Sequence, residues 1–415
     1  MAANTLKKTL LRLAQEGSAA DFVSTVNSLK ARKKTTDGET PTVSISEFMQ
    51  LLSKNDREKL WTFLVQRKWF ATSISFIEGT DAETLFCELE SLTDDEHVTT
   101  TRQDSVDALL AISLCVMHYL QTSNPTKVSL DCHAVACNLH DLLFNLNDEE
   151  DSLLKKNILR ICEFFCLNKV DGYDGLVSRY LPLLLFQALA DDAKPADVKR
   201  VFNVRHAFAV FDLEDDSSES IKAQLLGCFL SPCFVGDKWG TKFLAFVFRM
   251  SSPAMMKNIH KVVKDQLPYA KKSILVNYGE LYFAVWDSCE DNSTFLEQFE
   301  TNCLQDLFDK TTHARPDVFK SLMRVLSPIH DHKRDSGKRH GKKAGAVDAM
   351  LLKLYEPFLW RSLNVANPTV RHNAIVLLAD LFPLQSPEIS QHSDIEALAT
   401  RQYDALYAAL MDPSP

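Results

Sequence analysis

The stretch Leu354–Leu384 reads LYEPFLWRSLNVANPTVRHNAIVLLADLFPL and predicts two helices joined by a tight turn. Pro357 falls inside the apolar pattern of the first helix, where a proline ring kinks a helix. Asn367 and Pro368 predict the start of the second helix, because the Asn side chain can accept a hydrogen bond from a free backbone N–H and Pro has no N–H to leave unpaired. The apolar stripe of the second helix consists of Val370, Ala374, Leu377, Leu378 and Leu381, and Pro383 is expected to end it.

A kinked helix, an Asn-Pro turn, a Val-Arg pair and an apolar stripe together form the pattern of a HEAT repeat. Val370 and Arg371 are the Val-Arg pair, and we favour a contact with the neighbouring repeat over a DNA contact for Arg371. Asp412-Pro413 follows Asn367-Pro368 by 45 residues, within the ~40–47 residues of such repeats. The pattern therefore predicts that a second repeat begins there and that the chain stops within it.

The remaining sequence also favours helices, because glycine is scarce at 12 residues and strand-like alternation is rare. We predict an all-α fold, a right-handed HEAT-type α-solenoid of antiparallel helix pairs that is incomplete at its C-terminus, with roughly sixteen to eighteen helices. The expected regions are an N-terminal helical region (1–91), degenerate HEAT-type repeats (104–327), a basic disordered loop (328–345) and a HEAT repeat with the start of the next (346–415).

The composition is that of an ordinary globular protein, with 46% hydrophobic and 24% charged residues. A net charge of −9 excludes a uniformly basic, nucleic-acid-coating protein, so any DNA contact requires a local patch. The ten cysteines lie mostly in apolar helical patterns, and no secretory signal opens the sequence. The longest apolar run, Leu181–Ala190, is too short to span a bilayer. We expect a soluble intracellular protein with free thiols and no membrane contact.

Four residues raise the possibility of a zinc site, because thiolates and imidazoles are the ligands that zinc prefers. On a helix, however, positions 132 and 137 point in different directions, and no second ligand pair lies nearby, so a buried helix face is the favoured interpretation. The four residues are Cys132, His133, Cys137 and His140.

Catalytic motifs are also missing. The segment from Asp335 to Lys342 superficially resembles a phosphate loop but lacks its spacing and a preceding strand. We found no nucleophile-elbow, zinc-protease or paired-carboxylate pattern. The sequence therefore predicts no enzyme activity, no metal, no cofactor and no small-molecule substrate.

Two basic clusters are candidate DNA contacts. The first, with His330, His332 and His340 among its cations, can neutralise phosphates, serve as a nuclear import signal, or simply be a solvated loop. The second begins with lysines spaced i, i+4 and i+7 on one helix face, which can track a DNA backbone or be an ordinary solvent face. The first cluster comprises Lys333, Arg334, Lys338, Arg339, Lys342 and Lys343, and the second Lys257, Lys261, Lys264, Lys271 and Lys272.

An acidic run with interspersed serines precedes the helix expected to end near Leu230. It can be a phosphorylation target or a solvated loop. The run comprises Glu214, Asp215 and Asp216 with Ser217, Ser218 and Ser220.

Four longer segments resemble one family, the G-type HEAT-repeat subunit of condensin II, and their order and spacing match the amino-terminal region of that family. The resemblance extends from about residue 104 to the end of the chain, and it is specific because these segments differ from the generic repeat. They span residues 197–229, 242–286, 296–310 and 349–384 and include VKRVFNVRHAFAVFDLEDDSSES, KNIHKVVKDQLPYAKKSILVNYGELYFAVW, LEQFETNCLQDLFDK and YEPFLWRSLNVANPTVRHN.

The resemblance implies a non-catalytic subunit in the nucleus, on chromosomes. Such subunits bind the condensin II kleisin, and together they grip double-stranded DNA through a positively charged surface during mitotic chromosome condensation. The ATPase resides in the paired SMC subunits. Family members are several times longer, so a fragment or a short isoform is expected. The alternative function is a HEAT-type scaffold or transport adaptor that binds only proteins.

Overall fold

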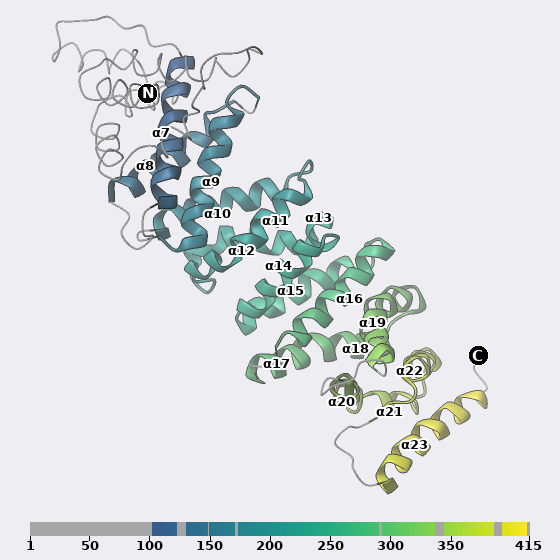
Figure 1. The fold of residues 1–415 in the computed structure, drawn as a ribbon. Coiled ribbons are helices and arrows are strands. Elements are labelled where there is room, and N and C mark those ends of the chain that lie inside the picture. Colours follow the sequence, from purple (N-terminus) through teal and green to yellow (C-terminus); the bar gives the residue numbers. More distant parts are fainter. Residues whose placement is uncertain are drawn as a thin grey trace, which may run out of the picture. The chain divides into compact units, whose positions relative to one another are not determined.

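The computed structural model describes residues 102–122, 130–147, 149–170, 173–289, 293–336, 344–385 and 392–412 (Figure 1). The helical region predicted at 1–91 lies outside the described residues. In the part that the structure does describe, all regular elements are helical, with 17 α-helices and no strand. The all-α fold class is therefore confirmed, whereas the HEAT-repeat topology stays a prediction.

The chain divides into two compact units. Unit 1 comprises Met1–Leu183 and His206–Val210, and unit 2 comprises Leu184–Arg205 and Phe211–Pro415. The described helices of unit 1 are α7 (Arg102–Thr122), α8 (Leu130–Asp141), η3 (Leu142–Phe144), α9 (Ser152–Asn168), the first part of α10 (Tyr173–Leu189) and most of η4 (Arg205–Val210).

Unit 2 begins with the end of α10 and contains all later helices except most of η4. They are α11 (Pro195–Asn203), η5 (Asp216–Ser218), α12 (Glu219–Leu230), α13 (Pro232–Val235), α14 (Lys238–Met250), α15 (Pro253–Gln266), α16 (Lys272–Asp287), α17 (Ser293–Phe299), η6 (Glu300–Leu304), α18 (Gln305–Thr312), α19 (Pro316–Ser336), α20 (Ala344–Tyr355), α21 (Leu359–Ser362), α22 (Pro368–Leu381) and α23 (His392–Leu410).

The core of unit 1 forms where α7 packs against α9. The buried side of α7 includes Leu109, Ile112 and Val116, whereas Leu114 is only half-buried. Helix α9 contributes Ile158, Ile161 and Phe165, which are all fully buried. Removing this apolar surface from water stabilises the pair, by roughly 25 cal/mol for each Å² buried.

In unit 2, helices pack against helices that lie one to four α-helices further along the chain. The contacting pairs include α11 with α14, α12 with α15, α14 with α16, α16 with α19, α18 with α22, and α22 with α23 (Figure 1). Each helix therefore has its main contacts with near neighbours in sequence, as expected for stacked helix pairs.

The helix pair predicted at Leu354–Leu384 is present in unit 2. Pro357 separates α20 from the short helix α21, so it breaks the first helix rather than kinking it. The side chain of Asn367 accepts a hydrogen bond from the backbone N–H of Thr369 (3.0 Å), and Pro368 is the first residue of α22. The apolar stripe from Val370 to Leu381 is buried, and α22 ends before Pro383.

Two prolines lie inside helices. Pro182 lies in the middle of α10, which begins at Tyr173. Pro328 lies inside α19, which continues to Ser336. The prediction of an irregular loop is therefore wrong for 328–336 and for the start of α20.

Tertiary burial explains why α19 continues past Pro328. Ile329 and His330, which follow the proline, are 1% and 0% exposed. The His330 imidazole is hydrogen-bonded to the carboxylate of Asp380 on α22 and lies 3.4 Å from the Tyr355 hydroxyl on α20. These contacts outweigh the one backbone hydrogen bond that the proline cannot make.

Candidate nucleic-acid interface

The lysines predicted on α15 and at the start of α16 belong to unit 2, and most of them are exposed. Lys257 and Lys261 are exposed on one face of α15, and Lys271 and Lys272 are exposed at the next helix start. Within the described part of the chain, none of these four forms an ion pair. Their ammonium groups are therefore available to an anion in solution.

Lys264, the third lysine of the row, is already bound within the fold. Its Nζ donates to Asp306 Oδ2 of α18 at 2.7 Å, and its side chain is only 20% exposed. Lys310 Nζ lies 3.6 Å from the same carboxylate oxygen. The role of Lys264 is therefore to tie α15 to α18, and we remove it from the candidate DNA contacts.

The same carboxylate holds a buried histidine. His260 Nε2 lies 2.9 Å from Asp306 Oδ2, and His260 Nδ1 lies 2.6 Å from the hydroxyl of Tyr282 on α16. The hydrogen bond with His260, together with Lys264, holds the pKa of Asp306 well below its usual range. Burial lowers the pKa of His260 and raises that of Tyr282. A neutral imidazole satisfies this network, donating from Nε2 and accepting at Nδ1.

Acidification is therefore expected to destabilise the α15–α16–α18 region. Because the folded pKa of His260 is lower than its unfolded value of about 6.5, the unfolded chain takes up the proton first, and stability decreases as the pH falls below about 6.5. The expected loss is at most about 1.4 kcal/mol per pH unit. Asp306, with its lowered pKa, adds a further loss below about pH 4.

Hydrogen exchange of the α15 and α16 amides at pH 7.5 and 5.5, corrected for intrinsic rates, measures this effect. His260→Gln cannot titrate, so the pH-dependent loss of protection should be smaller in the variant. Equal losses in the two proteins would show that His260 is not responsible.

The described residues of the first basic cluster and its neighbouring histidines, Lys333, His330 and His332, pack against other parts of the fold. Lys333 Nζ donates to the carbonyl oxygen of Pro383 at 2.7 Å and lies 3.7 Å from Asp348 Oδ1, and its side chain is 10% exposed. His330 is buried, and the ring of His332 stacks on Phe283 with centroids 3.6 Å apart. We therefore remove Lys333 from the candidate contacts. The side chains of Arg334, Lys338, Arg339, Lys342 and Lys343, and of His340, lie outside the described residues.

A basic–aromatic cluster in unit 2 was not predicted from the sequence. Trp239 of α14 and Phe202 of α11 are half-buried with ring centroids 5.1 Å apart. The ammonium groups of Lys199 and Lys242 lie 5.3 Å and 5.1 Å from the Trp239 ring centroid. Arg205 lies over Phe202 at 4.2 Å. Such cation–π contacts hold the cations at the surface.

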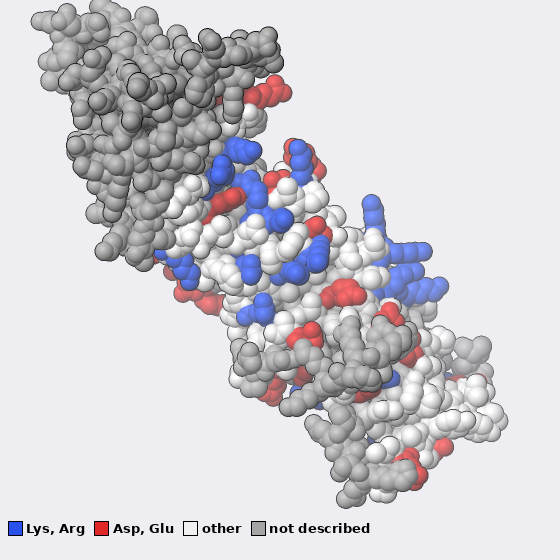
Figure 2. All heavy atoms as spheres, in the orientation of Figure 1, with Lys and Arg blue, Asp and Glu red and all other residues white. Residues whose placement is uncertain are grey.

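Figure 2 shows lysine and arginine side chains on the visible face over the helices labelled α11 to α16 in Figure 1, with acidic side chains dispersed among them. The sequence signal for the new cluster was an i, i+3 pair on each helix, Lys199 with Phe202 and Trp239 with Lys242. Each pair alone is unremarkable, and it is the packing of α11 against α14 that joins them.

Arg371 makes the contacts expected of a residue that links repeats. Its guanidinium forms two hydrogen bonds to the carboxylate of Asp412, at 2.7 Å and 3.0 Å. It also donates to the carbonyl oxygens of Val365 and Ala366. This pairing leaves Arg371 little capacity to bind phosphate.

The four residues considered as zinc ligands lie on α8 and pack into the fold or contact one another. Cys132 and His140 are buried, and Cys137 Sγ lies 3.6 Å from His133 Nε2. No group of three or more metal-ligating side chains is placed to hold an ion in the residues that the structure describes.

Within that same part of the chain, no helix has the length and apolarity needed to span a bilayer. The eight described cysteines are free thiols.

The acidic run forms the short 3-10 helix η5 and leads into the first residues of α12. The Asp215 carboxylate accepts a hydrogen bond from the backbone N–H of Ser217 at 2.8 Å, and that of Glu214 accepts one from Ser252. Ser218 is buried, whereas Ser217 and Ser220 are exposed. Phosphorylation of the two exposed serines stays a prediction.

Comparison with known proteins identifies related chains. Residues 227–386 match the family model described as "Condensin II non structural maintenance of chromosomes subunit". The chain is 28% identical over 378 residues to the human protein named "Condensin-2 complex subunit G2", covering 90% of this chain and 31% of that one. The Mus musculus protein of the same name is 27% identical over 378 residues, with the same coverage. The Xenopus laevis protein is 26% identical over 415 residues, covering 99% of this chain and 34% of that one.

These matches confirm the resemblance to the G-type non-SMC subunit of condensin II. The chain spans 31–34% of the length of these relatives. No solved structure matches it. The region matched by the family model contains the lysines of α15 and α16 and the helix pair at Leu354–Leu384, but not Lys199.

Proposed function

We propose that this chain acts within a condensin II non-SMC subunit as a non-catalytic arm that binds the kleisin and contacts double-stranded DNA without reading its sequence. The observation that carries the DNA contact is the set of exposed cations on α15 and α16, Lys257, Lys261, Lys271 and Lys272, which have no ion-pair partner among the described residues. Cations of this kind neutralise backbone phosphates and release counterions.

Several features support a grip by charge rather than by base recognition. Lysine ammonium groups on flexible stems act as point charges and suit phosphate oxygens. The net charge of −9 confines attraction to local surfaces. The basic–aromatic cluster around Trp239 supplies two further exposed lysines, Lys199 and Lys242, in the same unit.

The partners of the proposed subunit follow from the resemblance. The kleisin would hold the arm in the complex and so bring it to the paired SMC subunits, where ATP hydrolysis takes place. The site of action would be the nucleus and its chromosomes during mitotic condensation. The names of the relatives place those proteins in the condensin-2 complex, which supports this proposal.

Charge reversal on α15 tests the DNA contact. In the kleisin-bound chain, Lys257→Glu with Lys261→Glu is expected to weaken binding of a short double-stranded DNA about tenfold, because two phosphate contacts are lost. The slope of log K against log salt should become less steep by about 2. Fluorescence anisotropy over a salt series measures both quantities, and Lys271→Glu with Lys272→Glu should behave similarly.

A matched control uses two exposed lysines elsewhere, Lys156 on α9 and Lys320 on α19, also changed to Glu. This control has the same net charge and is expected to change the affinity less than twofold. Equal weakening in control and variant, or no weakening at low salt, would refute the assignment to α15. A wild-type chain that co-purifies with the kleisin but does not bind DNA would favour the protein-only scaffold.

The cations between Arg334 and Lys343 stay candidates for DNA contact or nuclear import. Lys338→Glu with Arg339→Glu separates these roles. Reduced DNA affinity of the purified complex indicates a contact, whereas loss of nuclear accumulation with unchanged affinity indicates an import signal.

A further inference from the structure

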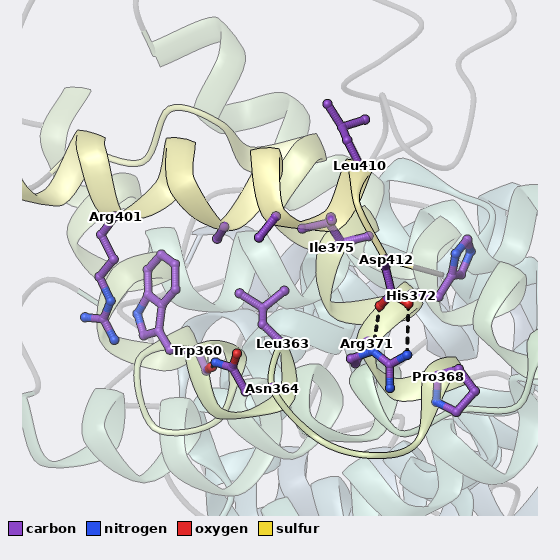
Figure 3. Close-up of a pocket in the computed structure, with 13 residues that line it drawn as sticks. Trp360, Leu363, Asn364, Pro368, Arg371, His372, Ile375, Arg401, Leu410 and Asp412 are labelled. Atoms are coloured by element: carbon purple, nitrogen blue, oxygen red, sulfur yellow. Dashed lines mark hydrogen bonds and ion pairs between the residues drawn. The ribbon is translucent and has the colours of Figure 1, made fainter. Parts of the chain in front are cut away.

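An open groove of about 820 Å³ lies in unit 2 between α21 and α22 on one side and α23 on the other (Figure 3). Trp360 and Leu363 line one wall, and Ile375 of α22 also lines the groove. The α23 wall consists largely of Ala405, Ala408 and Ala409. A volume of this size is within the range of pockets that bind ligands, roughly 300–1,000 Å³.

The sequence of α23 explains why the groove is hollow. Positions 401, 405, 408 and 409 follow one another at helical spacing and share one face of α23, and Asp412 lies just beyond its end. The three central positions are alanines, whose side chains are too short to fill the space opposite Leu363 and Ile375. Helices in a protein core normally interdigitate without such a void.

Contacts at both ends of the groove fix α23 in its position relative to α21 and α22. At one end, Arg371 pairs with Asp412 through two hydrogen bonds. At the other end, the guanidinium of Arg401 lies 4.3 Å from the ring centroid of Trp360 (Figure 3). The buried Gln402 side chain additionally bonds the backbone N–H and carbonyl of Leu384, at 2.8 Å and 2.9 Å. The groove is thus built into the packing of α23 on α22.

The charges around the groove indicate the chemistry of its occupant. Asp412 is the carboxylate among the lining residues, and Arg371 neutralises it. Arg401 is about half exposed, and its contact with Glu356 is a distant one at 4.0 Å. His372 is exposed at the rim. The apolar middle is therefore flanked by the half-exposed guanidinium of Arg401, whose contact with Glu356 is long enough to leave room for a second carboxylate. This arrangement favours a partner with a carboxylate beside apolar side chains.

We propose that this groove binds a short segment of a protein partner that carries bulky apolar side chains and an adjacent Asp or Glu. The apolar side chains lie against Trp360, Leu363 and Ile375, where burial in a preformed hollow provides the affinity. The carboxylate meets Arg401 and determines the direction of the segment. This interaction goes beyond the DNA contact proposed above and does not depend on it.

A library of short random peptides displayed on phage, selected against the full chain, tests the proposal. Selected peptides are expected to share apolar residues next to Asp or Glu. Ala405→Trp or Ala408→Phe fills the groove and should weaken their binding at least about tenfold, the loss typical of removing a central apolar contact. Arg401→Glu should weaken binding more than Arg401→Lys does.

Ala399→Phe is the matched control, because Ala399 is exposed on the opposite face of α23; it should leave peptide binding unchanged. The proposal is overturned if the selected peptides bind the filled and wild-type chains equally, or if they are enriched in Lys and Arg instead of acids. It is also overturned if sedimentation shows that the wild-type chain self-associates and the filled variants do not, since the occupant is then a second copy of this chain. Unchanged thermal melting of the variants excludes unfolding as the cause.

Discussion

Replacing Gly279 by alanine is expected to lower the free energy of unfolding of unit 2 by about 2–3 kcal/mol, the cost of overpacking a tight contact. Gly279 lies on α16, where a Cβ atom would be 2.1 Å from the backbone oxygen of Val325 and 2.9 Å from the ring of Pro328 on α19. A backbone oxygen cannot swing aside, so the two helices would have to separate. The gain in helix propensity, about 1 kcal/mol, offsets only part of this cost.

Urea unfolding followed by circular dichroism measures the change. Gly227→Ala is the matched control in the same unit, because a Cβ atom there would meet only the Leu189 side chain, at 3.5 Å. That variant is expected to be neutral or slightly stabilised. Equal destabilisation of the two variants would mean that the close approach of α16 and α19 is not what requires a glycine.

Replacing Asn373 by leucine is expected to cost about 2–3 kcal/mol, because buried polar groups lose their partner. The Asn373 side chain is 1% exposed on α22. Its Nδ2 donates to the carbonyl oxygens of Thr312 at 3.1 Å and Ala314 at 2.7 Å, at and just beyond the end of α18. Helix-end carbonyls have no partner within their own helix, and Asn373 supplies one from a neighbouring helix pair.

Thermal unfolding and hydrogen exchange at the end of α18 measure this loss. The control is Asn364→Leu, since the Asn364 side chain is exposed and donates to the Trp360 carbonyl within its own turn region. That change should cost less than about 1 kcal/mol. If the two substitutions are equally costly, Asn373 does not act as a cap for α18.

In the candidate DNA site, the position of a lysine on a helix face does not predict whether the lysine is free or bound within the fold. Lys257, Lys261 and Lys264 have equivalent spacing, so the sequence made them equivalent candidates. Tertiary packing distinguishes them, because Asp306 of α18 lies against Lys264 and leaves the other two exposed. Asp306 is 42 residues away in the sequence, and nothing in the local pattern indicates which lysine it will contact.

Lys333 illustrates the same limit for a charge cluster. It belongs to the dense basic segment 328–345, which was predicted to be a disordered loop. In the structure its ammonium is bound to the Pro383 carbonyl and lies near Asp348, on elements that follow in the chain. The basic–aromatic cluster of Trp239 and Lys199 was missed for the converse reason, since α11 and α14 must pack together before it exists.

The sequence by itself determined the features that depend on local backbone chemistry. These are the all-helical fold class, the Asn367-Pro368 helix start, the disturbance of the first helix at Pro357 and the apolar face of α22. The helix start and the disturbance at Pro357 arise from steric limits or hydrogen bonds within a few residues. The apolar face of α22 is set by the spacing of its apolar residues.

Only the tertiary structure decided the features that depend on contacts between distant residues. Pro182 and Pro328 lie inside helices, and residues Glu300–Leu304 form a short π-helix in which the buried Glu300 accepts hydrogen bonds from Trp286 and Lys353. Burial and long-range hydrogen bonds there outweigh local preferences of a few kcal/mol. Other long-range contacts bind Lys264 to Asp306 and so leave Lys257 and Lys261 exposed. The contacts of Arg371 with Asp412 hold α23 beside α22, with the groove between them.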